Sequence, residues 1–542
     1  MEILTPQDIW RGYNPDALPL AVSVLTDKTA NGMRTILAYY NGKITTDGAV
    51  RVFVRVFARA GGKGKLPAIV IMPDASGAQI DKAVLDFIKK GYVVIVPDYL
   101  GKGGKTSSIH TMYPPSLESS NFSYECFSER LSDVRRSAWI VWTEIFMRAV
   151  TYARSLSFVD KNKVAAIGFG ISSSAAIKLA AVDSRVCCVI SMYSSGYNVE
   201  GTSEVDLKYK AGVLDKAYAP LIKVPFLMMI SSNDYNNSLD YMSELFALVE
   251  QPDSRLSISE KKNHSVGYKQ RNNIDLFLEY CMSGRKGDIP KNPRLIMSTA
   301  DHKLYYTVKS PEPEADVNLF TAVDKREQRL RNWHLERLVV EGPGESTCCA
   351  SVIDPKIFVH VFANVNYESG FSFSTTVASL QPGIRGVRGS DVTFNRLVYD
   401  NDFGTDDWLS LLVNVGENEI NMQEGPFGIE GVHADSNELS TFKISDASNL
   451  GQEGLDLQVT LYSSVGQEIF FKISAYEQIA NEEKLIEFTA IKEAFPENGW
   501  SKIRLSPLDF KSSAGARLHW DHAALLKISA KDDFMVSSLL WV

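Results

Sequence analysis

The chain has little of several features that mark particular protein classes. Cysteine occurs only six times in 542 residues, which is too few for a disulfide-stabilised scaffold. No segment reaches the roughly 18 consecutive apolar residues of a membrane-spanning helix, so we expect no membrane partner. The first ten residues lack the charged and apolar pattern of a signal peptide, which predicts a cytoplasmic protein unless a leader has been removed.

A large excess of one charge is also absent. The 57 basic and 65 acidic residues leave a net charge of −8, which argues against nucleic acid as a partner. Hydrophobic residues make up 45% and charged residues 23%, the composition of a globular protein without long disordered segments. At roughly 100–200 residues per domain, the length predicts about three domains.

Cysteine and histidine do not cluster with the spacing of a zinc site, so we expect neither a metal nor a cofactor. Four cysteines form two adjacent pairs, 187–188 and 348–349, within apolar strand-like runs. Neighbouring strand residues point to opposite faces, which favours buried reduced thiols over bridges. His519 and His522 have a spacing that permits a metal pair, but packing at a strand edge is the preferred interpretation.

Residues 1–290 alternate predicted strands with predicted helices. The predicted strands are short apolar runs at 66–72, 92–97, 163–168, 186–192, 225–230 and 254–258. The predicted helices are 80–90, 130–157 and 173–182. Apolar runs buried on both faces are typical of a parallel sheet covered by helices, which predicts a doubly wound α/β domain.

From residue 291 onward, the pattern predicts two all-β domains. Residues 291–389 contain the predicted strands 303–308, 316–321, 334–340, 347–352, 357–364 and 371–379, typical of a β-sandwich. Residues 390–542 contain 408–415, 455–462, 468–475, 484–490, 500–505, 524–529 and 535–541, a spacing that suggests a jelly roll.

Three positions in the first domain predict hydrolytic chemistry. A strand leads into the glycine-flanked turn at 168–172, and a helix follows, which is the architecture of a nucleophile elbow. Asp234 follows a later strand, and His264 lies in a loop after the next one. The chain order of elbow, aspartate and histidine is one of the orders used by Ser–His–Asp hydrolases.

Further short motifs accompany this order. They are Asp8-Ile-Trp10, Leu18-Pro19-Leu20, Asp98-Tyr-Leu-Gly101, Ala219-Pro220, Val224-Pro225, Asn233-Asp234 and Asn263-His264. With them, residues 5–285 resemble α/β-hydrolases of the acetyl xylan esterase and cephalosporin-C deacetylase type, which are close to dienelactone hydrolases. The resemblance implies the α/β-hydrolase fold and an ester-hydrolysing ancestor, with Asp234 and His264 as acid and base.

The elbow departs from that family. The family serine lies ten residues after the aspartate that precedes the elbow strand, and this count leads to Gly170, which has no hydroxyl. Ser172, Ser173 and Ser174 are candidate substitutes, although helix N-terminal capping also explains all three.

The oxyanion loop departs as well. The backbone N–H of Ile171 is one expected oxyanion donor, and a second is expected near Asp74 or Ala75. A carboxylate at Asp74 opposes a developing oxyanion unless it points away.

The last domain resembles the galactose-binding-like jelly rolls of carbohydrate-binding modules. Its matching segments are Tyr399-Asp-Asn-Asp402-Phe403, Asp407-Trp408, Gly499-Trp500, Asp509-Phe510, Trp520 and Leu539-Leu540-Trp541. Sugar binding needs an exposed aromatic side chain, and the sequence does not tell which aromatic residues are exposed. The aromatic residues considered are Trp408, Tyr462, Tyr476, Trp500 and Trp520.

Three functions stay open at this point. The first is a catalytically impaired hydrolase that binds a small-molecule ligand, namely a carbohydrate or acylated sugar. The second is an active carboxylic-ester hydrolase that uses water or a nearby serine with Asp234 and His264. The third is an interaction or assembly protein. Under the first, Gly170→Ser is expected to restore some hydrolysis of acetyl esters.

Overall fold

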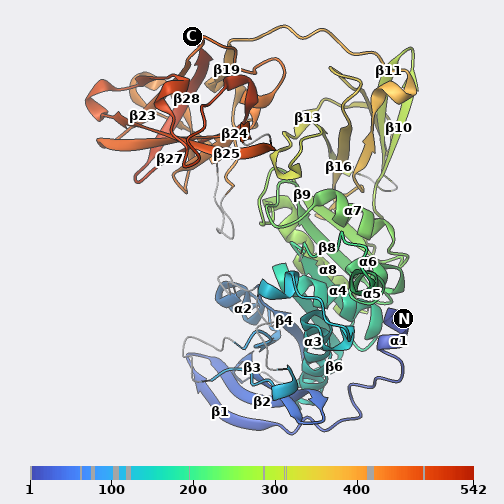
Figure 1. The fold of residues 1–542 in the computed structure, drawn as a ribbon. Helices are drawn as coiled ribbons and strands as arrows, with labels where there is room; N and C mark the ends of the chain where they lie inside the picture. The colour runs from blue at the N-terminus through green and yellow to red at the C-terminus, as the bar shows by residue number, and fades with distance from the viewer. Residues whose placement is uncertain are drawn as a thin grey trace.

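The computed structural model describes residues 3–542 apart from 62–63, 75–79, 102–108, 118–123, 195, 285–286, 311, 313, 412–419 and 480–481. Figure 1 shows a helix-covered sheet in the N-terminal half, strands of a middle part above it, and a C-terminal part drawn in orange and red. The predicted class, an α/β domain followed by all-β parts, is confirmed.

The first part is built on a nine-stranded sheet with the order β1-β2-β3-β5-β4-β6-β7-β8-β9. Its strands are β1 (Ser23–Ala30), β2 (Met33–Thr45), β3 (Gly48–Arg59), β4 (Leu66–Met72), β5 (Val93–Pro97), β6 (Val159–Phe169), β7 (Cys188–Met192), β8 (Phe226–Ser231) and β9 (Arg255–Ser259). Strands β4 to β9 pair in parallel and correspond to the six predicted apolar runs. The expected alternation with helices is wrong for residues 23–59, which form three antiparallel strands with no helix between them.

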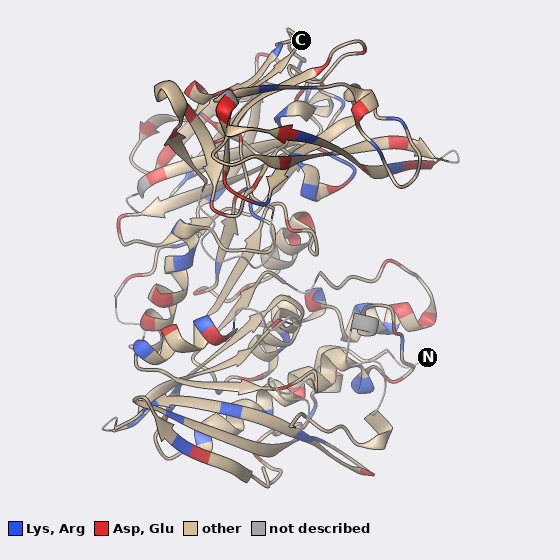
Figure 2. Cartoon of the chain, turned by 90° about the vertical axis from the view of Figure 1, so that its left-hand side faces the viewer, with Lys and Arg blue, Asp and Glu red and all other residues tan. Residues whose placement is uncertain are grey.

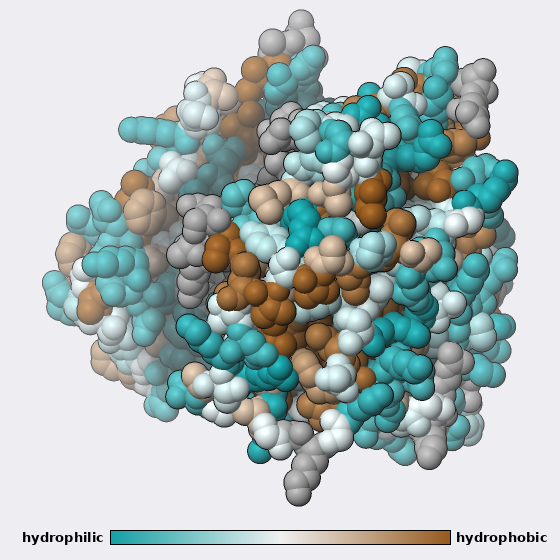
Figure 3. All heavy atoms as spheres, turned by 90° about the horizontal axis from the view of Figure 1, so that it is seen from below, coloured by the Kyte–Doolittle hydropathy of each residue, from teal (hydrophilic) through white to brown (hydrophobic). Residues whose placement is uncertain are grey.

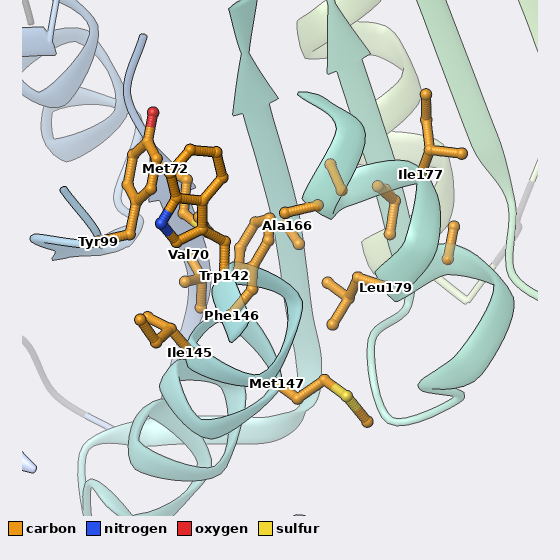
Figure 4. Close-up of a cluster of buried hydrophobic side chains, with 14 of the residues drawn as sticks. Val70, Met72, Tyr99, Trp142, Ile145, Phe146, Met147, Ala166, Ile177 and Leu179 are labelled. Atoms are coloured by element: carbon orange, nitrogen blue, oxygen red, sulfur yellow. The ribbon is translucent and has the colours of Figure 1, made fainter. Parts of the chain in front are cut away.

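Helices cover both faces of this sheet. They are α1 (Pro6–Ile9), α2 (Ile80–Lys89), α3 (Ala138–Ser155), α4 (Ser173–Val182), α5 (Glu204–Gly212), α6 (Asp215–Tyr218), α7 (Leu239–Ala247) and α8 (Tyr268–Met282). Helix α3 is almost wholly buried, because apolar residues lie all around it. Figure 4 shows Trp142 and Phe146 of α3 beside Val70 and Met72 of β4. The predicted helix 130–157 is too long at its start, since α3 begins only after Ser137.

The middle part consists of two antiparallel sheets. One has the order β10-β11-β15-β14, and the other has the order β13-β12-β16-β17, with β18 also paired to β16. The strands are β10 (Arg294–Ala300), β11 (Lys303–Lys309), β12 (Glu314–Val323), β13 (His334–Glu336), β14 (Val339–Gly342), β15 (Glu345–Cys349), β16 (Val359–Tyr367), β17 (Ser372–Ser374) and β18 (Ala378–Leu380). The single strand expected over 334–340 divides into β13 and β14, which lie in different sheets.

The C-terminal part also has two antiparallel sheets. Their orders are β20-β21-β28-β23-β26, with β19 paired to β28, and β22-β27-β24-β25. The strands are β19 (Leu397–Asp400), β20 (Ile420–Glu424), β21 (Glu430–Ala434), β22 (Glu438–Thr441), β23 (Leu457–Ser463), β24 (Gln467–Ile479), β25 (Glu482–Ala494), β26 (Ser501–Leu505), β27 (Ala523–Ala530) and β28 (Phe534–Trp541). Strands β19 to β22 were not predicted, because each is short and mixes polar with apolar residues.

The predicted strand 408–415 is not seen over 408–411, where Leu409 and Ser440 form an isolated bridge. The remainder of that prediction lies outside the described residues. The jelly-roll assignment therefore stays a prediction.

The surface mixes charges and carries some apolar residues. Acidic and basic residues are interspersed over all three parts in Figure 2. The face seen from below in Figure 3 carries a hydrophobic patch, and the exposed apolar residues near β1 include Val22, Val24 and Leu25. Among the described residues, no helix is both long and apolar enough to cross a membrane.

Candidate functional site

The predicted elbow is present at the end of β6. The chain turns at Gly170, which has φ +53°, passes through a short 3-10 helix (Gly170–Ser172) and enters α4. A Cβ at Gly168 would lie 2.8 Å from the Cβ of Ala176, so only glycine permits this close approach of strand and helix. A left-handed residue between a strand and a helix is the backbone of a nucleophile elbow, and here it carries no side chain.

Asp234 and His264 meet at the same end of the sheet. Asp234 follows β8, and its Oδ2 lies 2.9 Å from His264 Nδ1 after β9. Asp234 also accepts hydrogen bonds from the backbone N–H of Asn236 at 2.8 Å and from Asn237 Nδ2 at 3.0 Å. The aspartate is thus held from three directions, and it orients the imidazole ring as an acid–base pair requires.

The carboxylate of Asp74 fills the space in which a side chain at Gly170 would lie. A Cβ at Gly170 would overlap Asp74 Oδ1 and would lie 2.6 Å from Asp74 Cγ. The same Oδ1 accepts the N–H of Ile171 at 3.3 Å, which is the donor expected for the oxyanion. Asp74 follows β4 directly, and β4 is the neighbour of β6, so its side chain reaches across to the elbow. Ala75, the other oxyanion candidate, lies outside the described residues.

Comparison with known proteins agrees with this geometry. Residues 54–260 match the family model of dienelactone hydrolases. The N-terminal part is an α/β-hydrolase domain. No curated protein matches the chain.

Solved structures similar to the chain include two acetyl xylan esterases. That of Paenibacillus sp. R4 shares 16% identity over 49% of this chain and 90% of its own, with a TM-score of 0.39. Acetyl xylan esterase 1 of Thermoanaerobacterium sp. JW/SL YS485 shares 15% sequence identity over 52% of this chain and 95% of its own, with a TM-score of 0.38. A glucuronoyl esterase of Solibacter usitatus shares 13% sequence identity over 49% of this chain and 86% of its own, with a TM-score of 0.35.

Nearby charges and burial have opposite effects on the pKa of His264 in the hydrolase domain. Burial lowers the pKa of His264, but the hydrogen bond and charge of Asp234 and the charge of Asp74 outweigh it, so the pKa is raised above its ordinary value. The two carboxylates therefore favour the protonated form of the imidazole more than the surroundings of an ordinary histidine do.

The pair is closed off from solvent. The side chains of His264 and Asp234 are only 3% and 1% exposed. Tyr193 after β7 packs on the imidazole with ring centres 4.8 Å apart. Neither Tyr193 nor Asn237 was predicted from the sequence, although Tyr193 directly follows β7 and Asn237 lies three residues after the acid, where site residues of parallel sheets gather.

The three elbow serines are fully buried and lie in other environments. Ser172 Oγ donates to Met72 O at 2.7 Å and accepts from the backbone N–H of Phe169 at 2.9 Å, tying the elbow to β4. Ser174 Oγ donates to Asp215 at 2.6 Å. Ser173 Oγ has no hydrogen-bond partner among the described groups.

Among the described residues, none of the three hydroxyls forms a hydrogen bond with His264. The capping interpretation is wrong for Ser173 and Ser174, which lie inside α4. Ser172 makes no capping bond to α4, but its Oγ accepts the N–H of Phe169 at the start of the 3-10 helix Gly170–Ser172. The hydroxyl of Ser172 ties the elbow to β4, and that of Ser174 binds Asp215 of α6.

The loops that carry Asp234 and His264 also form hydrogen bonds with the middle and C-terminal parts. Asn233 Nδ2 donates to the carbonyls of Arg329 and Arg331 of the middle part, both at 2.9 Å. Asn263 Nδ2 donates to Leu411 O of the C-terminal part at 2.7 Å. Each of these asparagines adjoins a predicted catalytic residue, so the site loops serve as the junction between the parts.

The aromatic candidates of the C-terminal part are mostly interior. Trp408 and Trp520 are buried, whereas Tyr462, Tyr476 and Trp500 are half-buried. Among the described aromatic residues of this part, Phe427 is the most exposed, at 89%, and it has φ +63°. Phe427 was not predicted from the sequence, because a single phenylalanine between Pro426 and Gly428 carries no pattern. A bulky residue in the left-handed region is strained, which draws attention to its exposed ring.

Proposed function

We propose that the protein is an α/β-hydrolase that no longer turns over esters and that binds a carbohydrate or an acylated sugar. The observation that carries the first half is the position of Asp74. Acyl-enzyme chemistry needs a hydroxyl at position 170 and a free N–H at Ile171. The first is lacking, and a carboxylate accepts the second.

Electrostatics point the same way. The oxyanion of a tetrahedral intermediate would have to form where the Asp74 carboxylate now lies, and two negative charges in one small space repel. Loss of one oxyanion donor alone reduces rates by roughly 10²–10³-fold. Loss of a nucleophile leaves at most about 10³–10⁴-fold over the uncatalysed reaction.

The carbohydrate half is supported by three aromatic residues, namely Phe427, Tyr462 and Trp500. Trp500 Nε1 donates to Pro426 O at 3.0 Å, and its ring centre is 6.0 Å from that of Tyr462. The exposed ring of Phe427 packs near Gly499, beside this tryptophan. An exposed ring accepts the apolar face of a sugar, and nearby polar groups then bind hydroxyls.

A second candidate is hydrolysis by a water molecule activated by His264. The 2.9 Å contact between His264 and Asp234 favours it, because such a pair orients a general base. The two candidates differ in one measurement. A water-based hydrolase loses its activity in His264→Ala, whereas a protein without turnover shows the same background rate in both forms.

The test uses the full chain in two assays. Hydrolysis of small acetyl esters by the native protein is compared with His264→Ala, and equal rates are expected. Binding to a glycan array is compared between the native protein and Phe427→Ala, with exposed Leu508→Ala as the matched control. We expect the first substitution to reduce binding and the second to preserve it. Ester turnover that depends on His264 would contradict the proposal. A native chain that binds no glycan would contradict it as well.

A further inference from the structure

A second group of chemically active side chains lies in the C-terminal part, far along the chain from the hydrolase domain. Glu477 belongs to β24, and His519 and His522 lie at the two ends of a 3-10 turn, Trp520–His522, that leads into β27. Their ligand atoms all lie within 4.8 Å of one another. The two histidines are separated from Glu477 by more than 40 residues, so only the fold brings the three together.

Glu477 is placed where an apolar residue would be expected. Along β24 the buried positions alternate, and Ile469, Phe471, Ile473 and Ala475 all face the apolar core. Glu477 continues this row, and its side chain is only 6% exposed. A carboxylate in such a position is costly unless it is bonded or binds a cation. Its Oε1 accepts the backbone N–H of His519 at 3.1 Å, which accounts for one oxygen.

The other oxygen faces both imidazoles. His519 Nδ1 lies 3.0 Å from Glu477 Oε2, and His522 Nδ1 lies 3.2 Å from the same atom. His519 directly precedes the 3-10 helix, and the backbone N–H of His522 donates to the carbonyl of His519 at 3.1 Å, so the turn keeps the two residues close. Metal–ligand distances of about 2.0–2.1 Å in a tetrahedral zinc site separate neighbouring ligand atoms by roughly 3.3 Å. The two observed separations are close to that spacing.

We propose that Glu477, His519 and His522 form a binding site for a divalent transition-metal ion of the zinc class. Two imidazole nitrogens and one carboxylate oxygen match the ligand preference of this ion and leave its fourth position for water or another ligand. The side chains of His519 and His522 are 50% and 42% exposed, so the open position faces solvent and an ion can enter. Glu477 supplies the buried negative charge that the cation compensates.

The experiment measures zinc binding by the full chain after treatment with a chelator. Isothermal titration with Zn²⁺ is expected to give one site per chain in the native protein. The same titration of His519→Ala/His522→Ala is expected to show at least about a 10-fold weaker affinity, since even partners outside the metal's ligand shell contribute that much. Replacement of zinc by Co²⁺ is expected to give the intense visible absorption of four-coordinate cobalt.

His334→Ala is the matched control. His334 is 47% exposed and lies 3.2 Å from Asp446, so it is also a histidine–carboxylate pair, but no second histidine joins it. This variant is expected to bind zinc as the native chain does. Circular dichroism of each metal-free variant checks that the fold is retained.

The proposal is overturned if the native chain binds no zinc, or if the double variant binds it as tightly as the native chain. It is also overturned if Co²⁺ gives only the weak absorption of six-coordinate cobalt, because Glu477 then serves only as a hydrogen-bond acceptor for two imidazoles. The cobalt spectrum of the native chain tests for a four-coordinate metal site even where a variant fails to fold.

Discussion

At the scale of single residues, the Asp74 carboxylate occupies the space in which a side chain at position 170 would lie. The sequence predicts that Gly170→Ser restores hydrolysis, since the elbow and the Asp234–His264 pair are both present. The structure changes this prediction, because the new Cβ overlaps the Asp74 carboxylate and the serine must adopt φ +53°. A residue in that conformation costs on the order of 1–3 kcal/mol.

We therefore expect no gain in turnover from Gly170→Ser alone. The double variant Gly170→Ser/Asp74→Ala frees the space and the Ile171 N–H, and it is expected to hydrolyse p-nitrophenyl acetate at least about 10²-fold faster than the native chain. Addition of His264→Ala is the control and should abolish the gain. A double variant no faster than this triple variant would show that the elbow serine is not activated by His264.

The pKa of His264 depends on the position of the Asp74 carboxylate. Its pKa is raised because Asp234 and Asp74 together outweigh burial, so Asp74→Asn is expected to lower it. NMR titration of the imidazole resonances measures the change, and Asp81→Asn on exposed α2 is the control. An unchanged pKa in Asp74→Asn would show that this carboxylate lies elsewhere in solution.

The raised pKa of His264 also makes the free energy of unfolding depend on pH. A folded-state pKa above the unfolded value of about 6.5 stabilises the protein fully below that value. The contribution is lost as the pH rises through the folded-state pKa of His264. Urea unfolding across this range should show a smaller loss in Asp74→Asn than in the native chain.

At the scale of elements, α4 is held by a buried ion pair beneath the elbow. Lys178 is fully buried, and its Nζ donates to Asp215 Oδ1 at 2.5 Å and to Ser174 Oγ at 2.6 Å. Burial lowers the pKa of Lys178, and the charge of Asp215 partly opposes this. The polar contact joins α4 to α6, whereas the rest of α4 packs through alanine, isoleucine and leucine.

Removing one partner of this pair leaves the other charge buried without compensation. We expect Asp215→Ala to lower the free energy of unfolding by about 3–5 kcal/mol. The double variant Asp215→Leu/Lys178→Met replaces both charges with apolar groups and is expected to recover most of that loss. Urea unfolding followed by circular dichroism measures both values. A single variant as stable as the native chain would contradict the buried pairing.

At the scale of the whole molecule, the parts share cores instead of merely being linked. Ile69 and Leu227 of the hydrolase sheet belong to the same apolar cluster as Val361 and Phe373 of the middle strands. Arg331 of the middle part is buried and binds both carboxylate oxygens of Asp240 on α7 at 2.7 and 2.8 Å. The hydrolase domain and the middle part are therefore expected to unfold together.

The C-terminal part is attached through fewer groups, and Asn263 is prominent among them. Loss of its bond to Leu411 O leaves a buried carbonyl unsatisfied, so Asn263→Ala is expected to weaken the attachment by about 1–3 kcal/mol. Limited proteolysis should then release the C-terminal part faster than in the native chain. Asn162→Ala, on the exposed end of β6, is the control. Equal cleavage rates in all three proteins would show that Asn263 does not hold the junction.

The sequence by itself determined the features that depend on local pattern. Apolar runs of the right length predict β4 to β9, and the chain order of the elbow, Asp234 and His264 predicts their meeting at the strand ends, because parallel strands bring their carboxyl ends to one edge. That Gly170 stands at the nucleophile position stays a prediction from the sequence, since it depends on counting along one segment. Strands β19 to β22 did not follow, because short strands of mixed polarity are stabilised by their neighbours.

Only the tertiary structure decided what fills the site and what surrounds it. Asp74 lies 96 residues before Gly170, and its overlap with the nucleophile position arises because β4 and β6 pair side by side. The contacts of Asn263 with Leu411 and of Glu477 with His519 likewise join distant segments. Such contacts depend on side-chain directions and on packing between elements, and neither leaves a periodic signal along the chain.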